Sequence, residues 1–224
     1  PEMGRQAAEE NRSEIAEALK GADLIFIAAP VGAFESIFTA LASKLNPDAL
    51  ITDGGSTKQN VVAAARAGLK SRIGQFVPAH PIAGTEYSGP RSGFATLFVN
   101  KWWLLTPASD ADPVAVARLQ QLLEGMQAKV NTMDAAHHDL VLAVVSHTPH
   151  LIAYTMVGVA DHLAQVSNSE VIEYSASGFR DFTRIAASDP TMWRDVFLTN
   201  KDAVLDIEDG TLEASLDYST QTLQ

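Results

Sequence analysis

The sequence predicts an α/β domain built on a parallel sheet, followed by an all-α domain. In residues 1–133, short apolar segments alternate with segments of helical periodicity, the order that builds a parallel sheet covered by helices. From Asp134 onward the strand-like alternation stops and long helical stretches take its place. We therefore predict two domains, residues 1–133 and residues 134–224.

Strands are expected where apolar runs end at glycine, proline or turn residues. The first, Leu24–Ala29, lies between Gly21 and Pro30 and is continuously apolar, which is typical of a parallel strand buried on both faces. The further predicted strands are Ala49–Asp53, Gln75–Ala79, Lys101–Thr106 and Ala128–Thr132.

Helices are expected where apolar residues recur three or four positions apart. In the first domain these are a short helix between Ser13 and Gly21, then Phe34–Leu45, Lys58–Leu69 and Pro113–Met126. In the second domain, Asp134–Leu163 has the length of one long helix. Pro149 lies inside it and should kink it, because proline lacks the backbone N–H and crowds the carbonyl of Val145.

Composition limits the possible partners. The 224 residues include 16 basic and 27 acidic side chains, a net charge of −11 that repels nucleic acids and anionic membrane surfaces. No apolar run approaches the roughly 20 residues of a membrane-spanning helix. The sequence has no cysteine, which excludes disulfides and thiolate chemistry, and it shows no secretory leader. We expect a cytoplasmic protein with neither nucleic-acid nor membrane partners.

The strongest candidate for chemistry is His80, which directly follows the predicted strand Gln75–Ala79. The carboxyl ends of strands in open α/β sheets are where ligands bind. An imidazole there can accept a proton near neutral pH, and Pro81 stiffens the turn that directs the ring. The alternative is a histidine whose hydrogen bonds are satisfied locally at a strand end.

Two turns are expected to lie at the same edge of the sheet as His80. In Asp53–Lys58, two glycines permit close approach of a ligand, and the hydroxyls of Ser56 and Thr57 precede a helix. This turn could hold a ribose or a nicotinamide, or it could be an ordinary glycine turn with a helix cap. Ala29–Gly32 is a similar turn after the preceding strand.

The helical domain carries two further candidate segments. Ser146–His150 places two imidazoles three residues apart, and we weighed a metal site, core or capping histidines, and contact with a small acid, of which the last is favoured. His137 and His138, by contrast, are expected on a solvated helix face. In residues 178–195 an arginine could bind a carboxylate, or it could form a structural ion pair with a nearby aspartate. The candidate arginines are Arg180, Arg184 and Arg194, and the aspartates are Asp181, Asp189 and Asp195.

These segments, in this order, resemble the prephenate dehydrogenase family, including its cyclohexadienyl and arogenate dehydrogenase members. The resemblance runs from about Ile15 to Val204. It rests on Ala22-Asp23-Leu24 with Ala29-Pro30-Val31, on Asp53–Lys58, on His80–Glu86 with Ser88-Gly89, on Ser146–His150 and on Gly178–Asp195.

The resemblance implies a Rossmann-like domain followed by a helical domain for dimerisation and substrate binding. It implies oxidative decarboxylation of prephenate to 4-hydroxyphenylpyruvate in tyrosine biosynthesis, with hydride transfer to NAD; NADP as cofactor and arogenate as substrate stay open. A homodimer through the helical domain is expected. No metal is implied.

The resemblance also assigns roles to individual residues. His80 and Ser56 would be catalytic, His80 drawing the proton from the ring hydroxyl and Ser56 orienting His80 and the nicotinamide. Substrate contacts fall on His150, Arg184, Thr85, Glu86 and Trp193. Cofactor contacts fall on Ala29, Pro30, Val31, Gly55 and Ser56.

The sequence departs from the family pattern at its amino-terminal end. No Gly-x-Gly-x-x-Gly turn occurs in it, so we expect a partial dinucleotide-binding domain that lacks the first strand and the pyrophosphate-binding turn. Two alternatives follow: a non-catalytic fragment that keeps the substrate pocket but cannot hold NAD, and a different hydroxy-acid dehydrogenase of similar layout.

Overall fold

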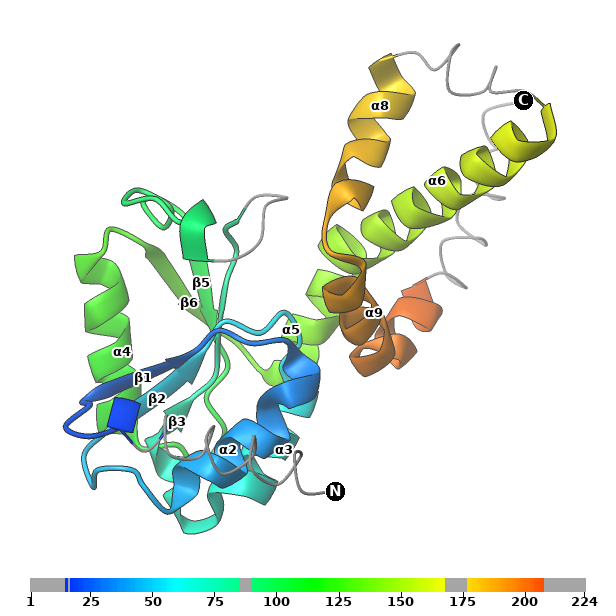
Figure 1. Cartoon of the computed structure of the whole chain (residues 1–224). Coiled ribbons are helices and arrows are strands. Elements are labelled where there is room, and N and C mark those ends of the chain that lie inside the picture. Colours follow the sequence, from blue (N-terminus) through cyan, green and yellow to red (C-terminus); the bar gives the residue numbers. More distant parts are fainter. Residues whose placement is uncertain (1–14, 16, 85–89, 168–176, 208–224) are drawn as a thin grey trace, which may run out of the picture. The chain divides into compact units, whose positions relative to one another are not determined.

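The computed structural model describes residues 15, 17–84, 90–167 and 177–207 (Figure 1). The chain divides into two compact units. The first extends to Ala83 and continues from Phe94 to His138; the second comprises Asp139 onward together with the described residues between Gly84 and Gly93. The first unit is α/β and the described elements of the second are helical, which confirms the predicted fold class. The domain boundary at 133/134 stays a prediction.

Two three-stranded sheets form the centre of the first unit. In one, β1 (Leu24–Ile27), β2 (Leu50–Asp53) and β3 (Phe76–Val77) are parallel and lie in that order. In the other, β4 (Ala79–Pro81), β5 (Trp102–Leu105) and β6 (Lys129–Thr132) lie in that order. The pair β5–β6 is parallel, as expected, whereas β4–β5 is antiparallel, so the prediction of a parallel sheet is wrong for this pair.

Pro78 divides the predicted strand Gln75–Ala79 into β3 and β4. Proline has no N–H to give to a ladder, and the carbonyl of Pro78 instead accepts a hydrogen bond from the Thr106 N–H at 2.9 Å. His80 therefore lies inside β4, paired with Leu104, and not in a turn after the strand end. The prediction that His80 lies in a turn after the strand is therefore wrong.

Helices bury both faces of β2. A single turn of 3₁₀ helix (Val31–Ala33) leads into α2 (Phe34–Ala42), and α2 and α3 (Gln59–Leu69) lie side by side (Figure 1). They pack on a core that includes Ile51, while α4 (Pro113–Gly125) packs on a second core that includes Leu50. The contact between α2 and α3 is close at Gly68, where an added Cβ would lie 2.5 Å from the Cβ of Phe38.

The expectation of burial on both faces holds for β2 but is wrong for β1. All four residues of β2 are buried, but Leu24 and Phe26 of β1 are 42% and 44% exposed. Among the described strands β1 lies at a sheet edge, where its outer face has fewer neighbours. Leu24 and Phe26 line a small apolar cavity of about 180 Å³ with Trp103 and with residues of α4.

The predicted helix Asp134–Leu163 is interrupted. It consists of α5 (Ala135–Leu142), a π-helical turn (Ala143–His147) and α6 (Thr148–Ser167). Pro149 lies in the first turn of α6, where its missing N–H costs little, and the wider π turn accommodates the proline ring ahead of it. The structure shows a π turn directly before this proline, and the kink expected at Pro149 stays a prediction.

By length and composition, Ala135–Leu163 is the one helical stretch among the described residues that could cross a membrane. The sequence did not predict such a helix, because scattered histidine, serine and threonine residues interrupt the apolar run in this stretch. Core helices of soluble proteins pass the same test.

The remaining helices are α8 (Ser177–Thr183), a 3₁₀ turn (Arg184–Ala187) and α9 (Pro190–Thr199). Asp189 caps α9, because its carboxylate accepts hydrogen bonds from the N–H groups of Thr191 and Met192. The Tyr154 hydroxyl donates to the carbonyl of Ser188 at 2.6 Å and ties α6 to the turn before α9.

Candidate functional site

His80 forms a hydrogen bond with a second buried histidine. Its Nδ1 lies 2.9 Å from Nε2 of His138, with the ring centroids 5.1 Å apart. His80 is 9% exposed and His138 is fully buried. The expectation that both His137 and His138 face solvent is therefore wrong for His138. Adjacent residues on a helix point about 100° apart, so a helix that packs with one of its faces buries one of the pair and leaves the other, His137, exposed.

The residue before His80 is held by a buried ion pair. The Asp53 carboxylate at the end of β2 contacts the Lys58 ammonium, and both side chains are fully buried. Asp53 also accepts hydrogen bonds from the N–H groups of Gly55 (2.8 Å) and Ala79 (3.0 Å), and Lys58 donates to the carbonyl of Ala79 (2.7 Å). The turn after β2 and the first residue of β4 are thus fixed to each other.

Sequence reasoning missed the role of this pair. It treated Asp53 and Lys58 only as the ends of a glycine turn. One signal in the sequence could have indicated it. An acidic residue ends an apolar strand, and a lysine follows five positions later. Charged residues in such surroundings are rarely buried unless they are paired, so the two could have been expected to form an ion pair.

The two predicted cofactor turns lie against each other. A Cβ on Gly55 would lie 3.0 Å from Cγ1 of Val31 and 2.9 Å from the Asp53 carboxylate. The space that a side chain at Gly55 would need is therefore filled by other atoms of the chain, and it is not open to a ligand. The N–H of Gly54 donates to the carbonyl of Ile27 at 3.1 Å, which ties the end of β1 to this turn.

The exposure of the cofactor candidates differs along these turns. Val31 is buried, Ala29 and Ser56 are partly exposed, and Pro30 is exposed. A Cβ on Gly54 would contact Pro81 at 3.7 Å. The structure thus brings the Gly54 turn next to the strand that carries His80, as the sequence predicted for these turns.

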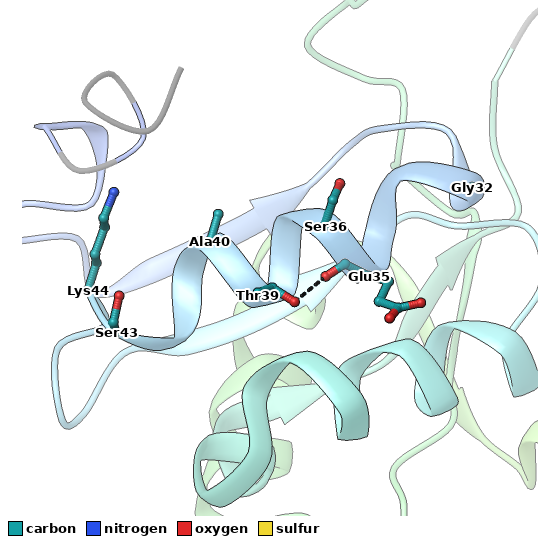
Figure 2. A pocket seen from close by; sticks show the side chains of 7 residues that line it. All are labelled: Gly32, Glu35, Ser36, Thr39, Ala40, Ser43 and Lys44. Atoms are coloured by element: carbon teal, nitrogen blue, oxygen red, sulfur yellow. Dashed lines mark hydrogen bonds between the residues drawn. The ribbon is translucent and has the colours of Figure 1, made fainter. Parts of the chain in front are cut away.

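A surface pocket of about 730 Å³ lies along the exposed side of α2, as Figure 2 shows. Two of the hydroxyls in its lining are used locally, since Ser36 and Thr39 donate to the carbonyls of Ala33 and Glu35. Its lining residues are Gly32, Glu35, Ser36, Thr39, Ala40, Ser43 and Lys44. They include Gly32 of the predicted turn Ala29–Gly32, but none of the residues to which a catalytic, substrate or cofactor role was assigned.

In the second unit, His150 and Trp193 form a stacked pair. Their ring centroids are 3.7 Å apart at an interplanar angle of 19°. Nδ1 of His150 donates to the carbonyl of Ser146 at 2.8 Å, because a carbonyl can only accept, and this leaves Nε2 for other contacts. Burial lowers the pKa of His150 below its usual value, although the hydrogen bond to Ser146 opposes that effect.

Trp193 has an unused donor. It is 7% exposed, and its buried Nε1–H has no hydrogen-bond acceptor within the described part of the chain. Buried indole N–H groups usually find a partner. The atom is therefore available to an acceptor from outside the described residues.

The two histidines of Ser146–His150 differ in environment. His147 is buried, and its Nδ1 lies 2.9 Å from the Asn200 amide nitrogen, which also donates to the carbonyl of Asp139. His147 is thus a core histidine, which was one of the alternatives. His150 is partly exposed.

The three candidate arginines also differ. Arg194 forms an ion pair with its neighbour Asp195, with Nη2 2.7 Å from the carboxylate, so the structural alternative holds there. Arg180 on α8 and Arg184 at the start of the 3₁₀ turn both have exposed side chains. Thr85 and Glu86 lie outside the described residues. The described candidates therefore form two sets, one around His80 in the first unit and one with His150, Arg184 and Trp193 in the second.

Replacing Lys58 by methionine should lower the free energy of unfolding by about 3–5 kcal/mol, because it leaves the Asp53 carboxylate buried without its counter-ion. Urea denaturation measures this loss. The double variant Asp53→Asn/Lys58→Met should lose less than the single one, since no charge is then buried. As a control, Arg66→Met removes the exposed pair with Asp110 and should have a small effect. An equally small effect of Lys58→Met would contradict the assignment.

The lowered pKa of His150 predicts a pH dependence of stability. The unfolded chain binds a proton at His150 at higher pH than the folded chain, so stability should fall as the pH drops below about 6.5. Unfolding free energies measured between neutral and mildly acidic pH should show a loss that the His150→Gln variant lacks. A titration of the His150 ring by NMR with a midpoint at or above the usual histidine value would refute this.

Two family models match this chain. Residues 3–132 match the nucleotide-binding domain of prephenate dehydrogenase, and residues 134–220 match its dimerization domain. The cyclohexadienyl dehydrogenase of Zymomonas mobilis is 40% identical over 196 residues, which cover 88% of this chain and 66% of that protein. The prephenate dehydrogenase of Bacillus subtilis is 43% identical over 189 residues, which cover 84% and 50% of the two chains.

Solved structures agree with these sequence matches. Prephenate dehydrogenase from Aquifex aeolicus in complex with hydroxyphenyl propionate and NAD+ is 34% identical, with a TM-score of 0.84, over 95% of this chain and 72% of that chain. Synechocystis arogenate dehydrogenase is 28% identical, with a TM-score of 0.73, over 93% and 74%. The chain spans between half and two thirds of the length of the curated relatives named above. By both domains, this chain belongs to the prephenate dehydrogenase family.

Proposed function

We propose that this chain catalyses the oxidative decarboxylation of prephenate to 4-hydroxyphenylpyruvate with NAD as hydride acceptor, in tyrosine biosynthesis. The observation that carries the proposal is His80, a buried imidazole hydrogen-bonded through Nδ1 next to two turns at the ends of parallel strands. Family membership and the ligands named for the Aquifex aeolicus enzyme support it. We also propose a cytoplasmic location, which a biosynthetic role of this kind supports.

The proposed reaction begins at the ring carbon of prephenate that bears the hydroxyl. As hydride leaves this carbon, Nε2 of the neutral His80 accepts the hydroxyl proton. Loss of carbon dioxide then breaks the bond to the ring carboxylate, and its electron pair makes the ring aromatic. The phenolic oxygen takes the proton back from His80. Aromatisation supplies much of the driving force, so the residues of the site mainly align the groups and place charge.

The described turns fit the nicotinamide half of the cofactor. Ala29, Pro30 and Val31 form an apolar turn at the end of β1, and Ser56 adds a partly exposed hydroxyl at the end of β2. NAD, when bound there, supplies the hydride acceptor. Gly55 and Val31 keep the two turns in contact, and Ser56 orients the nicotinamide and His80. NADP is the alternative cofactor.

We assign substrate binding to the second unit. The exposed Arg184 guanidinium binds a substrate carboxylate through its planar fork. The Nε1–H of Trp193, which has no acceptor among the described residues, suits an acceptor oxygen of the substrate. Thr85, Glu86 and His150 complete the proposed pocket, in which a neutral His150 offers Nε2 as an acceptor.

That property of His150 favours a second candidate substrate, arogenate. Arogenate carries an ammonium group where prephenate carries a keto oxygen, and an ammonium group can donate to Nε2 of a neutral imidazole. The similarity to a structure named arogenate dehydrogenase, from Synechocystis, supports this candidate. Rates with each compound decide between the candidates.

We also propose a homodimer formed through the helical unit. Ile152, Met156, Val159 and Leu163 recur at helical spacing on α6 and are 44%, 41%, 49% and 45% exposed. Apolar side chains aligned in this way are typical of a protein interface. The dimerization-domain match over residues 134–220 supports a second copy of this chain as the partner. The net charge of −11 makes nucleic acid and anionic membranes poor partners.

His80→Asn should lower kcat by at least about 10²-fold, because the proton acceptor is lost. Arg184→Ala should chiefly raise KM. Formation of NADH measures both, with Arg194→Ala as the control because that guanidinium is already paired with Asp195. Near-full activity of His80→Asn would rule out the proposed base. Separate titrations test the fragment alternative, for which prephenate binds and NAD does not.

Met156→Glu should convert the dimer to a monomer, because it places a charge in the apolar stripe of α6. His162→Glu is the matched control, since this exposed residue lies on the same helix outside the stripe. Sedimentation measures both variants. A dimer that survives Met156→Glu unchanged would show that the stripe is not the interface.

A further inference from the structure

We propose that His138 is a positioning residue for His80: it accepts the Nδ1–H of His80 and holds that ring in the tautomer whose Nε2 carries no proton and can take the one from the substrate. The inference goes beyond the assignment of His80 as a base, and its catalytic part rests on the proposed function. It explains why a second histidine is fully buried beside the first.

The distance between the two rings requires one shared proton. At 2.9 Å, Nδ1 of His80 and Nε2 of His138 are within hydrogen-bonding range, and with two neutral rings one nitrogen donates while the other accepts. Either His80 donates to His138, or His138 donates to His80. The two arrangements place the remaining proton of His80 on different nitrogens.

Only one arrangement suits a base. If His138 donated, the proton of a neutral His80 would be on Nε2, and that atom could not accept another. If His80 donates, its Nε2 carries no proton and can accept one. The acceptor role of His138 also survives the reaction, because a protonated His80 still presents an Nδ1–H. The reverse arrangement would set two N–H groups against each other once His80 became charged.

Both histidines belong to backbone segments that are held by hydrogen bonds. His80 lies in β4, paired with Leu104 of β5, and the preceding Ala79 is bonded to both Asp53 and Lys58. His138 lies in α5, and its own N–H donates to the carbonyl of Asp134 at 2.9 Å. The contact between the rings is therefore a fixed part of the first unit. Both rings are buried, so water does not readily compete for this hydrogen bond.

Two variants separate the hydrogen bond from the space that the ring fills. In His138→Gln, the side-chain amide can place its oxygen where Nε2 lies and accept from His80. In His138→Leu, an apolar side chain fills part of the volume and cannot accept. His137→Leu is the matched control, because His137 is the exposed neighbour on the same helix.

The first readout is the tautomer of His80 in the whole chain, measured from ¹⁵N shifts of histidine-labelled protein without NAD or substrate. His80→Asn assigns the signals. We expect Nδ1–H in the wild type, retention of that form in His138→Gln, and its loss in His138→Leu. A wild-type His80 protonated at Nε2 would overturn the proposal, even where His138→Leu does not fold.

The second readout is steady-state kinetics. His138→Leu should lower kcat about 10- to 100-fold, the usual range for losing a partner that orients a histidine, with little change in KM. His138→Gln should recover most of that loss, and His137→Leu should match the wild type. Equal losses in the Gln and Leu variants would contradict the proposal. A wild type that binds NAD yet never turns over prephenate contradicts the proposed function instead, and the tautomer result stands apart from it.

Discussion

The buried ion pair between Asp53 and Lys58 is the constraint on which the rest of the first unit depends. Each charge alone would cost several kcal/mol to bury, so the two must be paired and hydrogen-bonded. The hydrogen bonds come from the N–H groups of Gly55 and Ala79 and from the carbonyl of Ala79. The pair is therefore satisfied only when the turn after β2 and the start of β4 are both in place, which makes the folding of these distant segments interdependent.

The ion pair affects the proposed base, His80, through a single residue, Ala79. Ala79 is fixed by both partners of the ion pair, and His80 follows it directly, so the backbone of the proposed base has little freedom along β4. His138 then limits rotation of the ring from the other side, through its contact with Nδ1. A reaction driven largely by aromatisation needs alignment more than it needs strong acids or bases. The contacts of Ala79 with the ion pair and the hydrogen bond to His138 together hold the imidazole of His80, and they are a physical means of supplying this alignment.

Local signals carried most of the fold and part of the site. The sequence predicted β2, α3 and α4 closely, because strong apolar periodicity and capping residues such as Asp112 act within a few positions. It did not predict that the chain passes from one sheet to the other at Pro78, because the pairing of β4 with β5 depends on residues that are distant in the sequence. His138 and Lys58 were missed for the same reason: their burial depends on what packs against them, and adjacent His137 carries the same side chain in an opposite environment.

The π turn between α5 and α6 explains why spacing alone could not relate the two sets of site residues. A π turn contains one residue more than an α turn, so every side chain after it is rotated by about 100° from the face an unbroken helix would give it. His138 precedes this turn and His150 follows it, on one covalently continuous helical stretch. The face on which His150 lies therefore depends on a turn that Pro149 favours. The direction of the His150–Trp193 pair, which we propose as part of the substrate pocket, therefore depends on this helix irregularity as well as on the two rings.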